Sequence, residues 1–257
     1  MVHGNPSWSF YYRNLVKTLS RDHRCIVPDH IGCGYSDKPG DDRYDYTLSR
    51  RVDDLEQLID SLHLQEKVTL IVHDWGGMIG MTWAVRHPER IARLVILNTA
   101  AFPLPKAKQF PLALRICRNT QLGTLLIRGF NAFAAGAASV GCKLHPLSRE
   151  LKRLYCLPYD SWRNRIATLR FVQDIPLAPG DRGYDLINTT AAGLEQFKEL
   201  PMLILWGEKD FVFDRHFLDE WVERFPGAEV HSWKDGGHYI LEDVQAEAVP
   251  LIVNFIG

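Results

Sequence analysis

Val72-His73-Asp74-Trp75-Gly76-Gly77 is the stretch that decides the fold. Val68 to Val72 is an apolar run that predicts a buried strand, and Gly76 to His87, stopped by Pro88, predicts a helix of small residues. A strand, a sharp turn and a helix in direct succession form a nucleophile elbow, whose apical side chain stands exposed above the sheet. In this chain the apical side chain is Asp74, a carboxylate rather than a serine hydroxyl.

The rest of the chain alternates in the same way. Further strands are predicted at Arg24 to Pro28, Leu94 to Leu97, Met202 to Trp206 and Glu229 to Ser232. Between Thr47 and Leu64 the apolar residues recur at helical spacing and predict an amphipathic helix with one face on a sheet. The alternation predicts an α/β fold with a mostly parallel, doubly wound sheet, in which ligands bind at the carboxyl ends of the strands.

Residues 102–190 break this alternation with helix-like segments interrupted by prolines. They hold 13 Lys and Arg against 5 Asp and Glu, a net charge of +8, whereas the whole chain carries -1. We therefore predict a helical cap at 102–190, inserted between two parts of the core at 1–101 and 191–257. Its apolar residues exceed the needs of one helix face, so some are expected to line a cavity; they are Leu112, Leu114, Ile116, Leu122, Leu125, Leu126, Ile127, Phe130 and Phe133.

A carboxylate at the elbow changes the chemistry, because it is ionised at neutral pH and attacks an electrophilic carbon without a base. The product is an ester of the enzyme, and its hydrolysis needs a water activated by a general base. His238, after Gly236-Gly237, is the predicted base. Asp210 follows an apolar strand and completes the order nucleophile, acid, histidine, with Asp214 and Asp235 as the alternatives for the acid.

A site for developing negative charge is predicted beside the elbow. His3-Gly4-Asn5-Pro6 offers a glycine turn and the side-chain amide of Asn5, which together with Trp75 can bind an anion. The backbone N–H groups of Asn5 and Trp75 would form an oxyanion hole. Val72 stands where serine hydrolases of this fold usually carry glycine, which weakens a lipase or esterase interpretation.

Composition narrows the function further. With 46% hydrophobic and 24% charged residues, the chain is typical of a globular protein, and no apolar run or leader pattern predicts a membrane span or a signal peptide. We expect a cytoplasmic protein with reduced cysteines, since the five cysteines are scattered. No metal-ligand spacing, dinucleotide fingerprint or dense basic run is found, so no metal, cofactor or nucleic acid is predicted.

At these residues the chain resembles the haloalkane dehalogenase family of α/β-hydrolases, in which a His-Gly-Asn-Pro segment and a His-Asp-Trp-Gly-Gly elbow occur together. The resemblance runs along the whole chain. It implies Asp74 as nucleophile, His238 as base, Asp210 as acid, and Asn5 with Trp75 as the pair that binds the leaving anion. Epoxide hydrolases share such elbows and use cap tyrosines, for which Tyr155, Tyr159 and Tyr184 are available.

Three further segments, Asn98 to Pro105, Asn164 to Pro176 and Asp210 to Asp214, resemble the β-lactone decarboxylases of bacterial long-chain olefin biosynthesis. This resemblance implies conversion of a dialkyl β-lactone to a cis-alkene and carbon dioxide, alongside other olefin-biosynthesis enzymes. Asp74 would attack either the carbonyl carbon or the ring carbon, and the sequence does not choose. A haloalkane dehalogenase that hydrolyses a carbon–halogen bond through an aspartyl ester is the alternative, followed by a non-catalytic binding protein.

Two expectations concern surfaces. The basic cap is expected to dock an acidic partner enzyme or an anionic membrane surface, with Arg149, Lys152 and Arg153 as the residues to test. Members of this fold usually have about two strands before the His-Gly segment, whereas His3 is nearly the first residue here. We therefore expect N-terminal strands to be missing and a sheet edge to be exposed.

Overall fold

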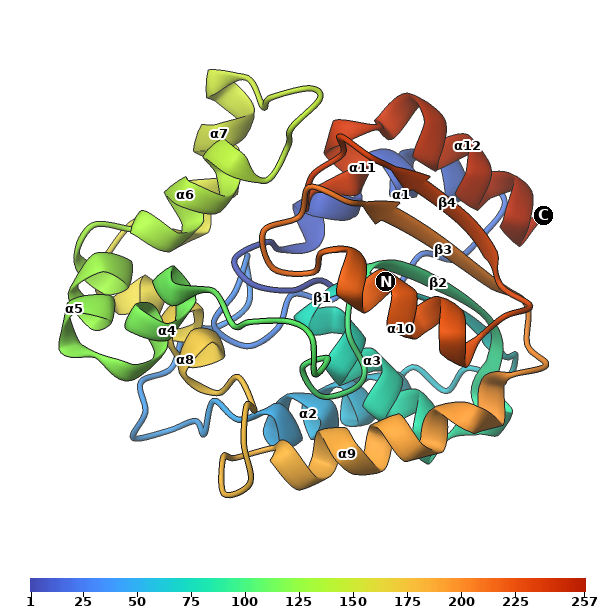
Figure 1. The fold of residues 1–257 in the computed structure, drawn as a ribbon, viewed down its shortest axis with the longest axis horizontal. Coiled ribbons are helices and arrows are strands. Elements are labelled where there is room, and N and C mark those ends of the chain that lie inside the picture. The colour runs from blue at the N-terminus through green and yellow to red at the C-terminus, as the bar shows by residue number, and fades with distance from the viewer.

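The centre of the structure is a sheet of four parallel strands in the order β1-β2-β3-β4, drawn in Figure 1. The computed structural model describes all 257 residues. The strands are β1 (Val68–Asp74), β2 (Ile91–Thr99), β3 (Met202–Gly207) and β4 (Glu229–Trp233). On the free side of β1, Val2 forms a single parallel bridge with Val72.

Four of the five predicted strands are confirmed, and the prediction for Arg24 to Pro28 is wrong. That segment forms no ladder. The terminal amino group of Met1 donates a hydrogen bond to the Ile26 carbonyl at 2.8 Å instead. An apolar run between two loops has the same local pattern as a strand, so only the absence of a pairing partner distinguishes the two.

One face of the sheet is covered by helices that share the larger apolar core. They are α2 (Leu48–Ser61), α3 (Trp75–Arg86), α9 (Tyr184–Gly193), η6 (Leu194–Phe197) and α10 (Arg215–Arg224), and the short turn η2 (Pro88–Arg90) leads from α3 to β2. The predicted amphipathic helix is α2, which starts after Thr47, whose hydroxyl accepts the N–H of Arg50. Alternate side chains of β2, those of Leu94 and Ile96, point to this core and pack in it.

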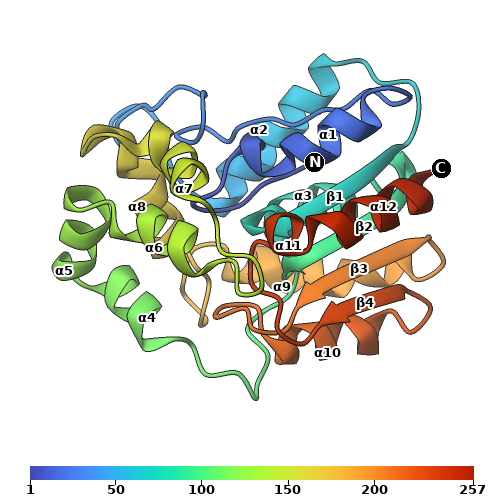
Figure 2. The same cartoon turned by 90° about the horizontal axis from the view of Figure 1, so that it is seen from above.

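The other face carries a second core, formed with η1 (Ser9–Tyr12), α1 (Arg13–Leu19), α11 (Ile240–Asp243) and α12 (Gln245–Ile256). Val95 and Leu97 of β2 point to this side. Figure 1 shows these helices above the sheet and those of the opposite face below it, and Figure 2 looks down onto the side that carries α11 and α12. Because strands are parallel and both faces are covered, the prediction of a doubly wound α/β fold is confirmed.

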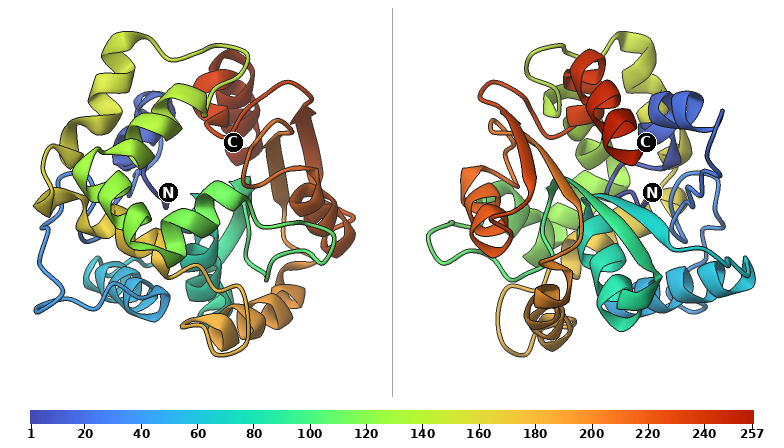
Figure 3. Two further views of the ribbon diagram at one scale, coloured as in Figure 1. Left: turned by 60° about the vertical axis from the view of Figure 1, so that its left-hand side comes forward. Right: turned by 90° about the vertical axis from the view of Figure 1, so that its right-hand side faces the viewer.

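The cap consists of short helices between β2 and α9. They are α4 (Leu112–Asn119), α5 (Gln121–Thr124), the π-helical turn η3 (Leu125–Gly129), α6 (Ala132–Val140), α7 (Arg149–Cys156), η4 (Leu157–Tyr159), η5 (Arg163–Arg165) and α8 (Ile166–Gln173). The cap lies over the carboxyl ends of the strands, as the left panel of Figure 3 shows by turning it toward the viewer. The boundary predicted at residue 190 falls inside α9, which packs against α3 of the core. None of the helices reaches the length and apolarity that crossing a bilayer requires.

Candidate active site

Asp74 sits at a strained turn between β1 and α3. Its φ of 53° and ψ of -128° belong to the left-handed side of the backbone map, which side chains other than glycine rarely adopt. The turn is crowded, since a Cβ on Gly4 would collide with the Asp74 carboxylate and a Cβ on Gly77 would collide with Thr99. The Thr99 hydroxyl donates to the Asp74 carbonyl. The elbow predicted from the sequence is therefore present, with the carboxylate at its apex.

The absence of glycine at Val72 is compensated across the helix. Val72 is fully buried, and one of its methyl groups would lie 2.8 Å from a Cβ placed on Gly80 of α3. Glycine at position 80 thus gives β1 and α3 the close approach that the elbow needs. The elbow therefore forms with valine in the strand because the facing residue of the helix is glycine, and it does not follow the serine-hydrolase pattern.

The two oxygens of Asp74 have different surroundings. Oδ1 accepts the backbone N–H of Asn5 at 2.6 Å, and the backbone N–H of Trp75 lies near enough to the carboxylate to favour its charged form. The second oxygen, Oδ2, lies 3.7 Å from Nε2 of His238. Burial raises the pKa of the Asp74 carboxyl to about 6, with His238 and the two N–H groups acting in the opposite direction.

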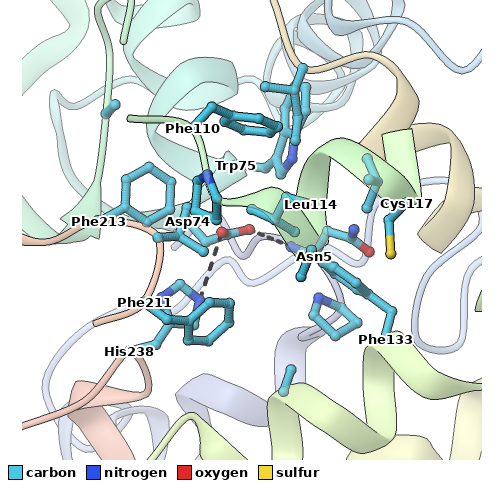
Figure 4. Close-up of a pocket in the computed structure, with 18 of the residues that line it drawn as sticks. Asn5, Asp74, Trp75, Phe110, Leu114, Cys117, Phe133, Phe211, Phe213 and His238 are labelled. Carbon is cyan, nitrogen blue, oxygen red and sulfur yellow. Dashed lines mark hydrogen bonds and ion pairs between the residues drawn. The ribbon is translucent and has the colours of Figure 1, made fainter. Parts of the chain in front are cut away.

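His238 and Asp210 form a buried pair beside Asp74. Nδ1 of His238 lies 2.7 Å from Oδ2 of Asp210, and both side chains are almost inaccessible to solvent. Burial alone would lower the pKa of His238, but the Asp210 carboxylate and Asp74 raise it above its usual value. Figure 4 shows His238 next to Asp74 at the floor of a cavity. The structure brings Asp210, rather than the alternatives Asp214 and Asp235, to the imidazole: Asp214 pairs with Lys108 and Asp235 lies near Lys209.

Asn98 is a site residue that the sequence interpretation missed. It stands at the end of β2 with a φ of 28°, and its Nδ2 donates to Oδ2 of Asp210 at 3.0 Å and to the carbonyl of Gly207 at 3.0 Å. Its Oδ1 accepts the N–H of Gly207 at 2.8 Å. An amide cannot serve as the acid of the triad. The position of Asn98 after a predicted strand was the signal that it orients the acid.

His73 also contributes from within the elbow. It is fully buried, and burial lowers its pKa well below the usual value, so its ring is uncharged. Its Nε2 lies 2.9 Å from the carbonyl of His238. An uncharged ring protonated on Nε2 donates to that carbonyl and holds the His238 loop against β1.

Asn5 and Trp75, the predicted anion-binding pair, both line the cavity next to Asp74, as Figure 4 shows. The Nδ2 of Asn5 donates one hydrogen bond to the Thr168 carbonyl at 3.1 Å, which leaves its second N–H for a ligand. The indole of Trp75 packs edge-on against Phe171, with ring centroids 5.1 Å apart. Thr168 and Phe171 are both on α8, so this cap helix positions both members of the pair.

Behind the pair lies a buried cation. The guanidinium of Arg51 is 3.7 Å from the Phe171 ring centroid and 3.7 Å from the Asp174 carboxylate. Asp174 also accepts the N–H of Leu48 at 2.6 Å. Burial raises the pKa of Asp174 to about 6, and Arg51 opposes that rise. The ion pair joins α2 of the core to the end of α8.

The cavity has a volume of about 380 Å³ and 22 hydrophobic residues among the 30 that line it. Of the predicted cap residues, Leu114, Leu126, Ile127 and Phe133 line the cavity, Leu112, Leu122, Leu125 and Phe130 are exposed, and Ile116 is half-buried outside the lining. Its few polar groups are Asn5, Asp74, Trp75, His238 and Lys108, and Lys108 is paired with Asp214. The cavity therefore suits an apolar molecule that presents one reactive group to Asp74.

The three cap tyrosines do not reach this cavity. Tyr155 donates from its hydroxyl to Glu242 at 2.5 Å, and Tyr159 donates to the Ser7 carbonyl at 3.3 Å. Tyr184 begins α9 and is also absent from the lining. The cavity offers no tyrosine to protonate an epoxide oxygen, so the geometry gives no support to the epoxide hydrolase alternative.

Known proteins resemble this chain in sequence and in fold. A family model described as alpha/beta hydrolase fold matches residues 1–244. The chain is 62% identical over 256 residues to a cis-3-alkyl-4-alkyloxetan-2-one decarboxylase of Shewanella oneidensis, covering 100% of this chain and 80% of that protein. It is 49% identical over 261 residues to a protein of the same name from Xanthomonas campestris pv. campestris, covering 100% and 87%. A solved haloalkane dehalogenase from Bradyrhizobium elkani is similar with a TM-score of 0.83 and 27% identity over 98% of this chain and 88% of that one.

Proposed function

The chain belongs to the α/β-hydrolase fold family, and from that premise we propose that it is a β-lactone decarboxylase, which converts a long-chain dialkyl β-lactone to a cis-alkene and carbon dioxide in olefin biosynthesis. An oxetan-2-one is the four-membered β-lactone ring, so the names of the two decarboxylases support the substrate class predicted from the sequence. The observation that carries the proposal is the open Oδ2 of Asp74, the one nucleophilic oxygen presented to an apolar cavity of 380 Å³.

Attack at the lactone carbonyl carbon is the route for which the site supplies each group. Oδ2 of Asp74 bonds to that carbon, and the resulting anionic oxygen faces Asn5 and Trp75. The ring then fragments. The bond between the carbonyl carbon and the adjacent ring carbon breaks, and its electrons form the alkene. The bond between the other ring carbon and the ring oxygen also breaks, and its electrons stay on that oxygen, which remains bonded to the carbonyl carbon. The carboxyl unit stays on Asp74 as a mixed anhydride of carbonic acid.

Release of that anhydride is the step assigned to His238 and Asp210. A water molecule gives a proton to Nε2 of His238 and attacks Cγ of Asp74, which frees bicarbonate and regenerates the carboxylate. The charge that develops on Oδ1 is stabilised by the N–H of Asn5, which already bonds to that oxygen, and by the nearby N–H of Trp75. Asp210 stabilises the imidazolium at 2.7 Å. Lactone and water thus give alkene and bicarbonate, which is hydrated carbon dioxide.

Attack at the ring carbon gives a role to fewer of the groups in the site. It would expel the lactone carboxylate toward Asn5 and Trp75, and the alkyl ester on Asp74 would lose carbon dioxide and re-form the carboxylate without water. The buried pair of His238 and Asp210 would then have no proton to transfer. The oxyanion arrangement around Oδ1 would also stay unused, so the carbonyl route has the better structural support.

A parallel assay separates the decarboxylase from the dehalogenase alternative. The purified protein is incubated with a long-chain cis-β-lactone and, separately, with 1-bromoalkanes of matched length. Alkene from the lactone is the expected product. Bromide release without alkene formation would replace the proposal with a dehalogenase, which shares the Asn5 and Trp75 pair.

A cytoplasmic location accompanies the proposal, supported by five cysteines that are all unpaired, as expected in a reducing compartment.

A further inference from the structure

Four large apolar side chains are exposed together on the outer side of the cap. Leu122 is 55% exposed, Leu125 48%, Phe130 70% and Trp162 48%. The side chains of Leu125 and Trp162 meet over Gly129, where a Cβ would lie 3.1 Å and 3.8 Å from them. Phe130 follows directly and bonds through its N–H to the Leu125 carbonyl at 3.3 Å. Leu122 stands three residues before Leu125, a spacing that places both on one face of the helical run, and we call the four exposed residues the cap patch below.

Two arginines lie beside the cap patch. The guanidinium of Arg128 lies 4.7 Å from the ring centroid of Trp162, and Arg163 is exposed beside it without an ion-pair partner. Residues 112–165 hold nine Lys and Arg against two Asp and Glu. Of the nearby acids, Asp41 is paired with Arg170 and Asp160 accepts from Asn164, while Asp37 and Asp54 line a surface pocket with Arg163, Lys38, Arg43 and Arg50. The local balance therefore favours contact with an anionic surface.

The cap patch shares a wall with the substrate cavity. The π-helical turn η3 points Leu126 and Ile127 into the cavity and exposes Leu125 on the other side. Figures 1 and 2 place α5, which leads into η3, at the end of the molecule farthest from the strands. A dry cavity of about 150 Å³ holds one benzene ring, so 380 Å³ holds roughly 15 carbon atoms. Two long alkyl chains exceed that capacity, and their ends need an apolar surface outside it.

We propose that the cap patch docks the protein onto an anionic phospholipid surface, from which the lipophilic substrate reaches the cavity and to which the alkene returns. The choice of substrate rests on the proposed function. A bilayer supplies an acyl boundary for Phe130 and the leucines, an interface of the kind that Trp162 prefers, and negative headgroups for Arg128 and Arg163. An apolar patch with two neighbouring arginines thus matches the acyl boundary, the interface and the headgroups of that surface.

Vesicle sedimentation tests the docking. The whole protein is mixed with vesicles of phosphatidylcholine alone or with one third phosphatidylglycerol, at two salt concentrations. Binding is expected only to the anionic vesicles and is expected to weaken with salt. Phe130→Ser combined with Trp162→Ser should weaken it by about tenfold or more. Arg128→Glu with Arg163→Glu should weaken it at least about 25-fold, since each lost cation near a membrane contributes about 1 kcal/mol.

Matched controls lie on the core. Tyr35→Ser removes another exposed aromatic ring, and Lys67→Glu with Arg24→Glu reverses two other exposed charges. Both control variants should bind anionic vesicles as the parent does. Equal loss in the controls would show a general charge or solubility effect and overturn the proposal. If the parent protein binds neither type of vesicle, the docking proposal is also overturned, and the cap patch would be a surface for a partner enzyme.

A water-soluble short-chain β-lactone separates this proposal from the proposed function. Cap-patch variants should turn over that lactone at the parental rate, and should lose at least tenfold in rate on a long-chain lactone embedded in anionic vesicles. If the parent fails on the short lactone, the proposed function fails whatever the vesicles show. If the parent succeeds on it and the variants keep full activity on the embedded lactone, only the docking proposal fails.

Discussion

Asn98 donates a hydrogen bond at 3.0 Å to Oδ2 of Asp210, the same oxygen that the imidazole of His238 approaches at 2.7 Å. One carboxylate oxygen is therefore fixed from two sides, by the end of β2 and by the loop after β4. Since Asn98 also bonds to Gly207 in both directions, it holds the whole turn that carries Asp210.

Asn98→Ala should lower kcat by about 10- to 100-fold with little change in KM. The lost hydrogen bond to a charged group is worth about 1.5–3 kcal/mol, and Asn98 touches the acid rather than the substrate cavity. Steady-state kinetics on a β-lactone measures both constants. Asn188→Ala, at an exposed asparagine of α9, is the control and should leave them unchanged. A rise in KM at constant kcat would contradict the positioning role.

The pH profile of kcat/KM should fall on its acid side near pH 6. Asp74 attacks as a carboxylate, and burial raises its pKa to about 6, so activity is present above that pH and decreases tenfold per unit below it. The apparent value belongs to the coupled pair of Asp74 and His238. Initial rates between pH 4.5 and 8 measure it. An acid limb near pH 4 would mean that burial does not raise the pKa of Asp74 in the free protein.

Single turnover in water enriched in oxygen-18 should place the label in Asp74. The carbonyl route ends with water attacking Cγ of Asp74, where the N–H of Asn5 bonds to Oδ1. Mass spectrometry of the peptide that contains Asp74 detects the added mass. Carbon dioxide exchanges oxygen with water, so the protein rather than the product is analysed. An unlabelled Asp74 after full turnover would contradict hydrolysis at Cγ, because attack at the ring carbon, or direct loss of carbon dioxide from the anhydride, regenerates the carboxylate without water.

The elbow and its partners could be predicted from the sequence because each follows a strand at the same sheet edge. Asp74, Asp210 and His238 were located by their order and by the apolar runs before Asp74 and Asp210. Contacts across the chain could not be located in this way. Gly80 compensates for Val72 only because α3 packs on β1, a contact that neither residue signals alone.

Arg51 and Asp174 illustrate the same limit and give a stability prediction. Asp174→Ala should lower the free energy of unfolding by about 3–5 kcal/mol, because Arg51 is fully buried and would keep an uncompensated charge. Arg51→Met combined with Asp174→Leu should lose less than Asp174→Ala alone. Urea unfolding measures each. Asp45→Ala breaks an exposed pair with Arg182 and should cost less than about 1 kcal/mol.

Filling the cavity should select for shorter substrates. Gly136 of α6 lines the cavity, and a Cβ there would meet nothing within 4 Å. Gly136→Leu should therefore fold well and place its side chain in the space for an alkyl chain. We expect kcat/KM to fall at least tenfold for a long-chain β-lactone and to change less than threefold for a short one. Equal losses for both chain lengths would show that the alkyl chains do not run past α6.

The nucleophilic role of Asp74 is tested most directly by the cis-alkene released from a long-chain cis-β-lactone by the parent protein and by the Asp74→Asn variant. Circular dichroism confirms that both proteins are folded, and gas chromatography quantifies the alkene. The parent should form stoichiometric cis-alkene over several turnovers, and Asp74→Asn should lose at least about 1,000-fold in rate because its amide cannot attack. Alkene formation at similar rates by both proteins, or none by a folded parent, would contradict a carboxylate-initiated decarboxylation.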